Sequence, residues 1–586
     1  MDAQALNRRA SEWYECNGSA ADAIHHALAA KDFERAANLI ELAVPEMRRD
    51  RQGAIVTELG WLKALPDELI RFRPVLSVAY AFALFGGGEI GGVEARLLDA
   101  ERWLDMMADT RKGTETTPAG MIVVDEDEFR RLPGMIALLR AAQALARGDV
   151  PETAKYARQV LDLALDGDHL MLGGAASQLG LAAWTNGDLE GACRMTADGM
   201  TNVRLAGYKS SAIGGAIVLA DIQIAQGRLR KAMSTYEQGL RWATEPGLPV
   251  VRGAADMHVG MSDLYREYND LKTASQHLIT SQSLGELAGL PQNPYRWCAV
   301  MARIREAQGD LDEALALLDK AERLYEANFS PNVRPIATRK TRVWLAQGRL
   351  GNALDWAREQ GLSVENELSY LREFDHITLV RVLLARYRSD RADLSISGVM
   401  RLLERLLKAA KERGGMGSVI EILVLQALAY HAQDNLPATL LPLQHALALA
   451  EPEGYVRIFV DEGEAMRLLL EKQSRNRDHP LSDYVDKLLA AFTRTAAAPK
   501  LATPALHQVQ RGASVIHQKS DMIEPLSERE LEVLKLLRSD LSGPEIAQQL
   551  SVSINTFRTH TKNIFIKLGV NDRRAAIRRA EELELF

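Results

Sequence analysis

A short turn sequence recurs between residues 148 and 348, and its spacing restricts the folds open to this chain. The copies read RGDV, NGDL, QGRL, YNDL, QGDL and QGRL. Their Gly or Asn stands at 148, 187, 227, 269, 309 and 348, so the gaps are 39, 40, 42, 40 and 39 residues. Weaker copies, KDFERA and QDNLPAT, occur near Lys31 and Asp434. A period of about 40 residues is typical of stacked structural repeats.

Each turn has the chemistry of a helix end followed by a helix start. Gly, or Asn at 269, suits the left-handed position after a helix C-terminus. An Asp then follows that can accept hydrogen bonds from the free N–H groups of the next helix, at Asp149, Asp188, Asp270 and Asp310. In the copies at 227 and 348 Arg replaces Asp, so that cap is missing or supplied otherwise.

A small side chain stands five residues after each Gly or Asn and allows two helices to approach closely. These residues are Thr153, Ala192, Ala232, Thr273 (with Ala274 beside it), Ala314 and Ala353. Between the turns the spacing of apolar residues is amphipathic, as in LDEALALLDKAERLYEA over 311–327. A helix pair that repeats in this way predicts an all-α, TPR-like solenoid over residues 1–470.

The solenoid is a scaffold whose concave surface we expect to bind an effector or a partner protein, although the pattern does not identify the residues. Trp184, Trp242 and Trp344 are interpreted as packing residues rather than as a ligand box, because aromatic side chains most often serve the core.

Bulk properties favour a cytoplasmic protein with several domains. At 586 residues the chain exceeds what one hydrophobic core usually serves. The polar start MDAQALNRRASEWYE is not a secretory signal, and no run of about 18 apolar residues predicts a membrane span. The three cysteines lie far apart without a CxxC pair, which fits a reducing compartment.

The repeat stops near residue 470, and a second kind of organisation follows. Residues 471–523 are predicted to form a terminal helix and a linker, since the stretch 493–521 is rich in Ala, Pro, Thr and Gln. Residues 524–586 then show strong helix punctuation. Ser527 with Glu530, and Ser542 with Glu545, form capping boxes. A helix over 554–568, joined by a short turn to the one before it, predicts a helix-turn-helix over about 542–568.

One face of the 554–568 helix has the residues that DNA recognition requires. Phe557, Thr561, Ile564 and Leu568 share the side that faces a core. The opposite side has, near its N-terminal end, the residues Asn555, Arg558, Thr559 and Lys562, and no acidic residue. Arg pairs with guanine in the major groove, and Lys reaches guanine or phosphate. The formal net charge of −7 does not oppose this interpretation, because the local field at the contact surface decides.

The C-terminal motifs LSERELEVLKLL, LSGPEIAQQLSVS, TFRTH, NIFIKLGV and Asn571-x-Arg573 resemble the LuxR-type DNA-binding domain over 526–586. The resemblance implies a small four-helix unit whose third helix reads double-stranded DNA. By position it implies base or groove contacts from Arg558, Thr559 and Lys562. It also implies backbone contacts near Thr556, Asn563 and Lys567. The fourth helix is the candidate dimer helix, with Ile577, Ala580 and Leu583.

The upstream region resembles the large maltose-regulator, or MalT-like, class of LuxR-type activators. The residues that carry this resemblance are RRASEWYECNGSAADAIHHALAAKDFERAANLIE, at 8–41, and EPEGYVRIFVDEGEAM, at 451–466. Proteins of this class place an ATPase module before the helical sensor. This sequence has no G-x-x-x-x-G-K-[ST] phosphate loop, so no ATP cofactor is expected. The chain is then a fragment, a shortened gene product or a regulator that does not use ATP.

These patterns predict a DNA-binding transcriptional regulator and no enzyme. The G-x-G-x-x-G pattern at Gly86, Gly88 and Gly91 follows a helical stretch rather than a strand, so it is interpreted as a turn between helices, and no HExxH or GxSxG motif occurs. We expect an activator, on the resemblance alone, that acts as a dimer or higher oligomer with RNA polymerase as a further partner. The alternative is a TPR-like adaptor, or a truncated regulator, whose DNA-binding domain is weak without a separate ATPase.

Overall fold

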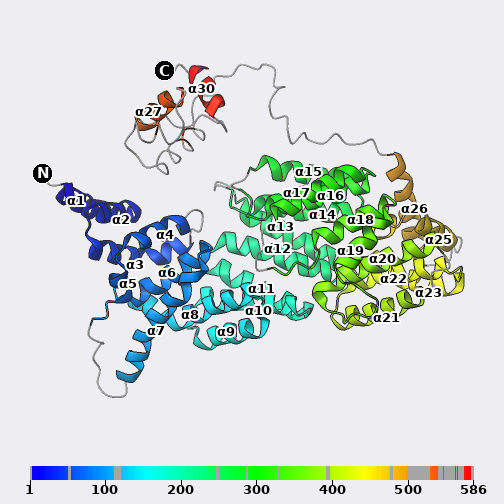
Figure 1. Cartoon of the computed structure of the whole chain (residues 1–586), viewed down its shortest axis with the longest axis horizontal. Coiled ribbons are helices and arrows are strands. Elements are labelled where there is room, and N and C mark those ends of the chain that lie inside the picture. The colour runs from blue at the N-terminus through cyan, green and yellow to red at the C-terminus, as the bar shows by residue number, and fades with distance from the viewer. Residues whose placement is uncertain are drawn as a thin grey trace. The chain divides into compact units, whose positions relative to one another are not determined.

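The computed structural model of the chain separates into two compact units, Met1–Leu501 and Ala502–Phe586 (Figure 1). In the first unit it describes residues 3–49, 54–110, 120–165, 167–245, 250–285, 288–325, 330–390, 396–474 and 480–497. In the second it describes residues 528–538, 546, 561, 564 and 573–582. Every regular element among these residues is a helix, as the repeat predicts.

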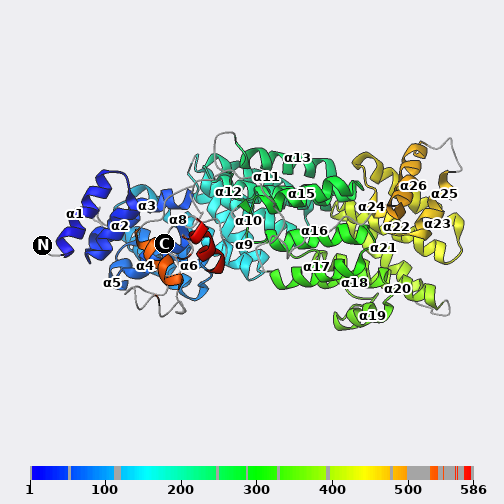
Figure 2. The ribbon, with the colours of Figure 1, turned by 90° about the horizontal axis from the view of Figure 1, so that it is seen from above.

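The first unit is a succession of helices that lie side by side in chain order (Figures 1 and 2). Its N-terminal helices are α1 (Ala3–Cys16), α2 (Ala20–Ala29), α3 (Phe33–Arg49), α4 (Ala54–Ala64), α5 (Asp67–Arg71), α6 (Pro74–Gly86) and α7 (Val93–Thr110). Its central helices are α8 (Glu126–Ala146), α9 (Val150–Leu163), α10 (His169–Thr185), α11 (Leu189–Leu205), α12 (Lys209–Ala225), α13 (Leu229–Ala243), α14 (Ala254–Glu267), α15 (Leu271–Ser283), α16 (Asn293–Ala307) and α17 (Leu311–Leu324). The last are α18 (Ile336–Ala346), α19 (Leu350–Glu359), α20 (Glu373–Ser389), α21 (Ile396–Glu412), α22 (Met416–Ala432), α23 (Leu436–Ala450), α24 (Arg457–Val460), α25 (Glu464–Ser474) and α26 (Ser482–Ala497).

The recurring turn adopts the predicted backbone at every copy. The residues at 148, 187, 227, 269, 309 and 348 all have φ between 62° and 81°, which is the left-handed region. Lys31 and Asp434, in the two weaker copies, also have positive φ, of 55° and 58°. The small residues after the turns are buried, at Thr153, Ala192, Ala232, Ala274, Ala314 and Ala353. The sequence period is therefore a structural period of one helix pair.

The predicted caps are also present. The carboxylates of Asp149, Asp188, Asp270 and Asp310 each accept a hydrogen bond from the backbone N–H three residues on. The two Arg copies have no side-chain cap of their own. At α13 a distant residue supplies one, because the Arg230 N–H donates to the Glu453 carboxylate at 3.0 Å.

The solenoid contacts itself across about 190 residues of chain. The indole of Trp184, at the end of α10, donates to the hydroxyl of Tyr370 at 2.9 Å, a sequence separation of 186. A Cβ placed on Gly187 would lie 2.9 Å from the Cβ of Tyr370. One placed on Gly227 would lie 3.0 Å from the Cβ of Met416, at the start of α22. The superhelix thus closes on itself, and the closure places α10–α13 against α20–α22.

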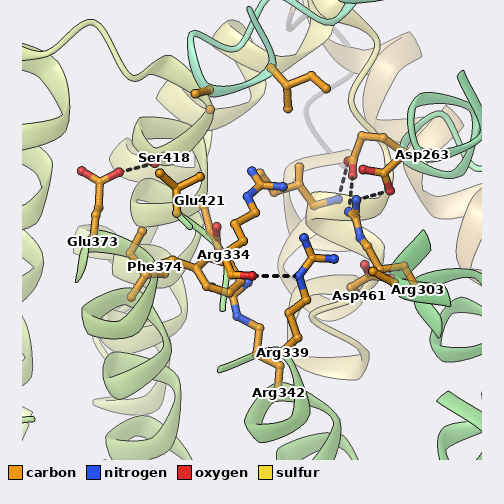
Figure 3. A pocket seen from close by; sticks show the side chains of 18 of the residues that line it. Asp263, Arg303, Arg334, Arg339, Arg342, Glu373, Phe374, Ser418, Glu421 and Asp461 are labelled. Atoms are coloured by element: carbon orange, nitrogen blue, oxygen red, sulfur yellow. Dashed lines mark hydrogen bonds and ion pairs between the residues drawn. The ribbon is translucent and has the colours of Figure 1, made fainter. Parts of the chain in front are cut away.

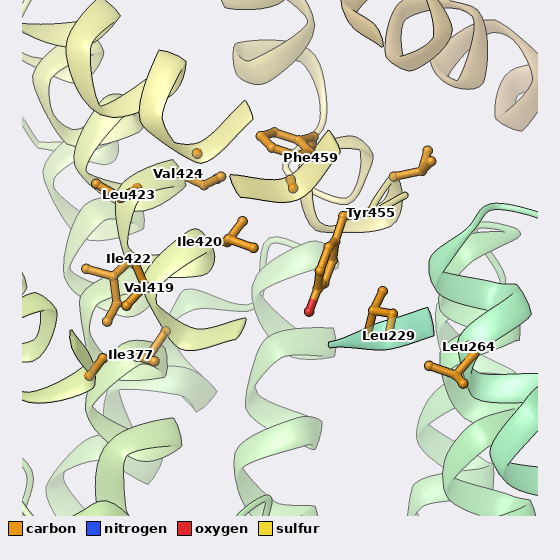
Figure 4. Close-up of a cluster of buried hydrophobic side chains, with 14 of the residues drawn as sticks. Leu229, Leu264, Ile377, Val419, Ile420, Ile422, Leu423, Val424, Tyr455 and Phe459 are labelled. Carbon is orange, nitrogen blue, oxygen red and sulfur yellow. The ribbon is translucent and has the colours of Figure 1, made fainter. Parts of the chain in front are cut away.

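The main hydrophobic core of the first unit lies where these two groups of helices meet. One continuous cluster of buried side chains combines residues of α12–α14 with residues of α20–α26 (Figure 4). Ile420, Val424 and Phe459 belong to it and are almost fully buried. Helix α26, which lies in the segment expected to hold a terminal helix and linker, adds Val485 and Leu488 to the same cluster.

The second unit is described by α27 (Glu528–Leu537), α30 (Arg573–Glu582) and four residues between them. Val533, Ile546, Ile564 and Ala576 have no exposed surface. Ile564 is thus on the core side of its helix, as predicted. The Arg573 guanidinium donates to the Leu537 carbonyl at 2.7 Å, which satisfies an acceptor at the C-terminus of α27. Within the described ranges of both units, no helix combines the length and the apolar character that a membrane crossing requires.

The turn at Gly227 provides a test of the closure. Gly227→Ala adds a Cβ in the left-handed region, which costs about 1–2 kcal/mol, and also forces that Cβ against Met416. Gly309→Ala is the matched control, because Gly309 has φ 79° but no neighbour within 4 Å. We expect Gly227→Ala to lower the midpoint of urea unfolding further than Gly309→Ala. Equal losses would contradict the close contact between the two turns of the superhelix.

Candidate functional site

A cavity of about 560 Å³ lies inside the closed superhelix. Its walls are formed by α14, α16, α18, α20 and α22 and by the segment 455–462. Eight arginines and eight acidic residues line it, together with several aromatic side chains. A cavity of this size falls within the range of small-molecule sites, about 300–1,000 Å³.

Helix periodicity directs the charged residues inward. Side chains three, four or seven residues apart share one face of a helix. On α18 the inward residues are Arg339 and Arg342, and on α16 they are Arg296 and Arg303. Phe374 and Arg381 on α20, and Ser418 and Glu421 on α22, follow the same rule.

The centre of the cavity is occupied by guanidinium groups from one short stretch. Figure 3 shows Arg334, Arg339 and Arg342 between Asp263, Arg303 and Asp461 on one side and Glu373 and Ser418 on the other. Arg334 precedes α18, and the Arg339 Nε donates to its backbone carbonyl at 3.3 Å. Burial, with the like charges of Arg303 and Arg334, lowers the pKa of Arg339.

Glu421 on α22 is shared by two arginines. Its Oε1 accepts from Arg342 Nη1 and from Arg381 Nη2, each at 2.8 Å. Arg381 also pairs with Glu462 at 2.5 Å. Burial alone would raise the pKa of Glu421, but Arg342 and Arg381 hold it at about 2. Burial, reinforced by Arg381 and Arg334, outweighs Glu421 and lowers the pKa of Arg342 to about 10.

The opposite wall has its own ion pairs. Arg303 on α16 pairs with Asp263 on α14. Arg266 on α14 pairs with Asp461 at 2.6 Å. Burial would raise the pKa of both carboxyl groups, and the surrounding arginines lower it instead. These four charges are therefore engaged with one another.

The segment 453–462 closes one end of the cavity. Glu453 caps α13, and the N–H of Ile458 donates to Glu267 at 2.9 Å. Arg457 is 3% exposed and donates to Asn269 at 3.2 Å and pairs with Asp461 at 2.5 Å. This segment therefore ties α13 to a residue 223 positions away, and α14 to one 191 positions away. The segment lies within EPEGYVRIFVDEGEAM at 451–466, a stretch that attracted attention in the sequence only because it resembles the MalT-like class.

Aromatic side chains complete the wall. The ring of Phe374 lies under the Arg342 guanidinium, 3.9 Å from its carbon to the ring centroid. Tyr295 and Tyr325 meet edge to face with centroids 5.1 Å apart. Trp184 lines the cavity but is only 3% exposed, in keeping with its interpretation as a packing residue.

The predicted DNA-binding residues lie outside the described residues. These are Asn555, Thr556, Arg558, Thr559, Lys562, Asn563 and Lys567, and Leu583 of the candidate dimer helix is outside them as well. Of the other two dimer-helix residues, Ala580 is fully buried within its own unit and Ile577 is partly exposed. The assignment of DNA and dimer contacts to these residues stays a prediction.

Comparison with known proteins identifies both units. The family described as the MalT-like TPR region matches residues 134–476, more than half of the chain. This chain belongs to the MalT-like TPR family. The luxR family of bacterial regulatory proteins matches residues 524–580, so the second unit is a LuxR-type DNA-binding domain. Both families are those that the sequence motifs resemble.

Full-length similarity supports the same assignment. The chain is 25% identical to the HTH-type transcriptional regulator MalT of Serratia proteamaculans (strain 568) over 605 residues. The match covers 100% of this chain and 62% of that relative, so the chain spans less than two thirds of its length. Two similar solved structures are a Rap protein complexed with competence and sporulation factor and the apo quorum sensor NprR from B. thuringiensis. The first has TM-score 0.44 and 11% identity, and covers 66% of this chain and 99% of that one. The second has TM-score 0.32 and 15% identity, and covers 74% and 99%.

The cavity of this MalT-like chain was not located from the sequence. Arg339 and Arg342 are three residues apart on one helix face, but many exposed arginine pairs share that spacing. A usable signal was the density of arginine in RPIATRKTR over 334–342, which stands in an otherwise amphipathic repeat. Only the closure of the superhelix turns this face inward.

Removal of the shared carboxylate tests the buried charge network. Glu421→Gln leaves two enclosed guanidinium groups without their common partner, so we expect a loss of about 3–5 kcal/mol in the free energy of unfolding. Asp355→Asn is the control, because the Asp355–Arg358 pair is exposed and such pairs contribute about 0–1 kcal/mol. Urea titration at neutral pH measures both. Similar losses for the two variants would contradict a structural role for the Glu421 pairs.

The same network predicts a pH dependence. Because the pKa of Glu421 is lowered to about 2, its contribution is present above its unfolded value near 4.5 and is lost as the pH falls toward 2. We expect the stability difference between the native chain and Glu421→Gln to shrink steadily across that window. Thermal unfolding at stepped pH values measures it, and a difference that is independent of pH from 5 to 2.5 would contradict the assigned pKa.

Proposed function

We propose that this chain is a transcriptional regulator that binds double-stranded DNA through residues 524–586 and takes its input through the cavity of the solenoid. The observation that carries the proposal is the match of residues 524–580 to the luxR family of bacterial regulatory proteins. The similarity of the whole chain to the transcriptional regulator MalT of Serratia proteamaculans also supports the proposal.

In the proposed mechanism, the solenoid controls DNA binding by changing how the chains associate or by freeing the LuxR-type domain. An effector that occupies the cavity favours one arrangement of the solenoid, and this changes how the chains associate or frees the LuxR-type domain. Dimers or larger assemblies then place the 554–568 helices in successive major grooves, about one helical turn apart. The proposal includes activation, contact with RNA polymerase and a cytoplasmic location.

The proposal assigns no catalytic reaction and no cofactor to this chain. Its support is the sequence, which has no phosphate-loop motif and no recognised catalytic motif. The cavity residues are engaged in ion pairs and hydrogen bonds between helices rather than in a nucleophile–base arrangement. The arrangement is suited to binding.

The recognition face can be tested by single substitutions in the full chain. Arg558→Ala and Lys562→Ala should each weaken binding to a selected DNA site by about ten- to a hundredfold, because each removes a base or phosphate contact of about 1–3 kcal/mol. Lys535→Ala is the control, since Lys535 is exposed on α27 and its loss changes the net charge equally. Binding titrations measure all three.

Salt dependence separates a contact surface from a general charge effect. The slope of log affinity against log salt should fall by about one for Lys562→Ala if Lys562 contacts phosphate. Unchanged affinity for both Arg558→Ala and Lys562→Ala would exclude this face. Binding that neither depends on salt nor discriminates between DNA sequences would favour the adaptor alternative.

A further inference from the structure

We propose that the solenoid cavity binds a small organic anion, a carboxylate or a phosphate, between Arg334, Arg339 and Arg342. This inference rests on the proposed function, because it names the chemical class of the input. It is argued from four features of the described residues: the distribution of partners, the unmatched donors, the aromatic wall and the volume.

The whole cavity has equal numbers of arginines and acidic residues, but around α18 the guanidinium groups outnumber the carboxylates. Around α18 five guanidinium groups, those of Arg303, Arg334, Arg339, Arg342 and Arg381, face three carboxylates, those of Asp263, Glu421 and Glu462. All three carboxylates are engaged by Arg303, Arg342 or Arg381. Within the described part of the chain no carboxylate forms an ion pair with Arg334 or Arg339.

The other acids beside these arginines have partners elsewhere: Asp461 pairs with Arg266 and Arg457, and Glu373 pairs with Arg413. Glu306 lines the cavity on α16, and burial, with the negative charge of Asp461, raises the pKa of its carboxyl group. Among the described residues Glu306 forms no ion pair with the arginines of the cavity. The local excess belongs to Arg334 and Arg339.

Two guanidinium nitrogen atoms in the cavity wall have no hydrogen-bond acceptor among the described residues. Arg342 Nη2 and Arg381 Nε are buried, and neither has a hydrogen-bond partner among those residues. A buried guanidinium that lacks an anion is strongly unfavourable, so such groups are normally paired. An anion in the centre of Figure 3 would receive charge-assisted hydrogen bonds from several of these groups at once.

Local packing orients two of the three arginines, Arg339 and Arg342, before any ligand arrives. Arg342 is held by Glu421, by the Thr378 hydroxyl at 2.9 Å and by the face of Phe374. Arg339 is held by the carbonyl of Arg334. Planar guanidinium groups with fixed forks are the usual partners of carboxylate and phosphate groups. The edge-to-face pair Tyr295–Tyr325 offers an apolar surface for the rest of the ligand.

The volume of the cavity limits the size of the ligand. About 560 Å³ accommodates a metabolite-sized molecule. The closing segment 453–462 and the contact between Trp184 and Tyr370 hold the two turns of the superhelix together around it. A folded partner protein does not fit such a space.

Calorimetric titration of the full chain, without DNA, tests the site. The probes are phenyl phosphate and phthalate, which present the two anion chemistries on an aromatic ring, and phthalamide, the neutral counterpart of phthalate. We expect at least one anion to bind with a dissociation constant of about 1 mM or below, and phthalamide not to bind. The preferred anion then distinguishes a phosphate from a carboxylate ligand. Equal binding of phthalate and phthalamide, or no binding by either anion at about 10 mM, would overturn the proposal.

Substitutions locate the binding and separate it from a structural role. Arg334→Gln and Arg339→Gln should each weaken anion binding at least tenfold. Arg358→Gln, on α19 with its side chain 78% exposed, should leave it unchanged. Because Arg339 is partly buried and forms no ion pair with a described carboxylate, the ligand-free Arg339→Gln chain should also melt no lower than the native chain. A lower melting temperature with unchanged anion affinity would show that Arg339 has a structural role only and would overturn the proposal.

The DNA titrations described above are independent of these measurements. Failure of DNA binding with intact anion binding would reject the proposed function and retain the site. Failure of anion binding with intact DNA binding would reject this inference alone.

Discussion

The left-handed turn between helices is the constraint on which the rest of the structure depends. One residue with positive φ lies in each copy of the recurring turn, and in four of the six copies a capping carboxylate on the following residue starts the next helix. A cap contributes about 1 kcal/mol, so no single turn decides the fold. Repeated every 39 to 42 residues, the turns add nearly the same rotation each time, and the accumulated rotation brings Gly227 against Met416. The cavity exists because the accumulated rotation brings two turns of the superhelix into contact.

The local structure could be predicted from the sequence because its causes are local. Gly309 and Asp310 determine their own turn, and Ala314 is buried by its immediate neighbour helix. The cavity could not be predicted, because the Glu453 cap of α13 joins residues 223 positions apart. Such pairings follow from the accumulated geometry of several repeats and not from any one of them. The DNA-contacting residues remain a prediction from helix-face chemistry and family resemblance.

The two units have complementary physical designs. The solenoid surrounds its cavity arginines with carboxylates and aromatic rings, so their charges act on a ligand that occupies the cavity. The LuxR-type unit has a small apolar core, with Val533, Ile564 and Ala576 buried, and its predicted recognition residues are cationic and free of acid neighbours. The two proposals thus assign the same guanidinium chemistry to a metabolite-sized anion in one unit and to the phosphates and bases of DNA in the other.

Selection of bound fragments from a random DNA pool by the full chain tests the central claim most directly. A sequence-specific regulator predicts enrichment of one motif with two half-sites spaced by about one helical turn. That enrichment should be lost at high salt and in the Arg558→Ala variant. Recovery of unenriched DNA, with the cavity still able to bind its anion, would contradict the claim and leave the chain as a ligand-binding adaptor.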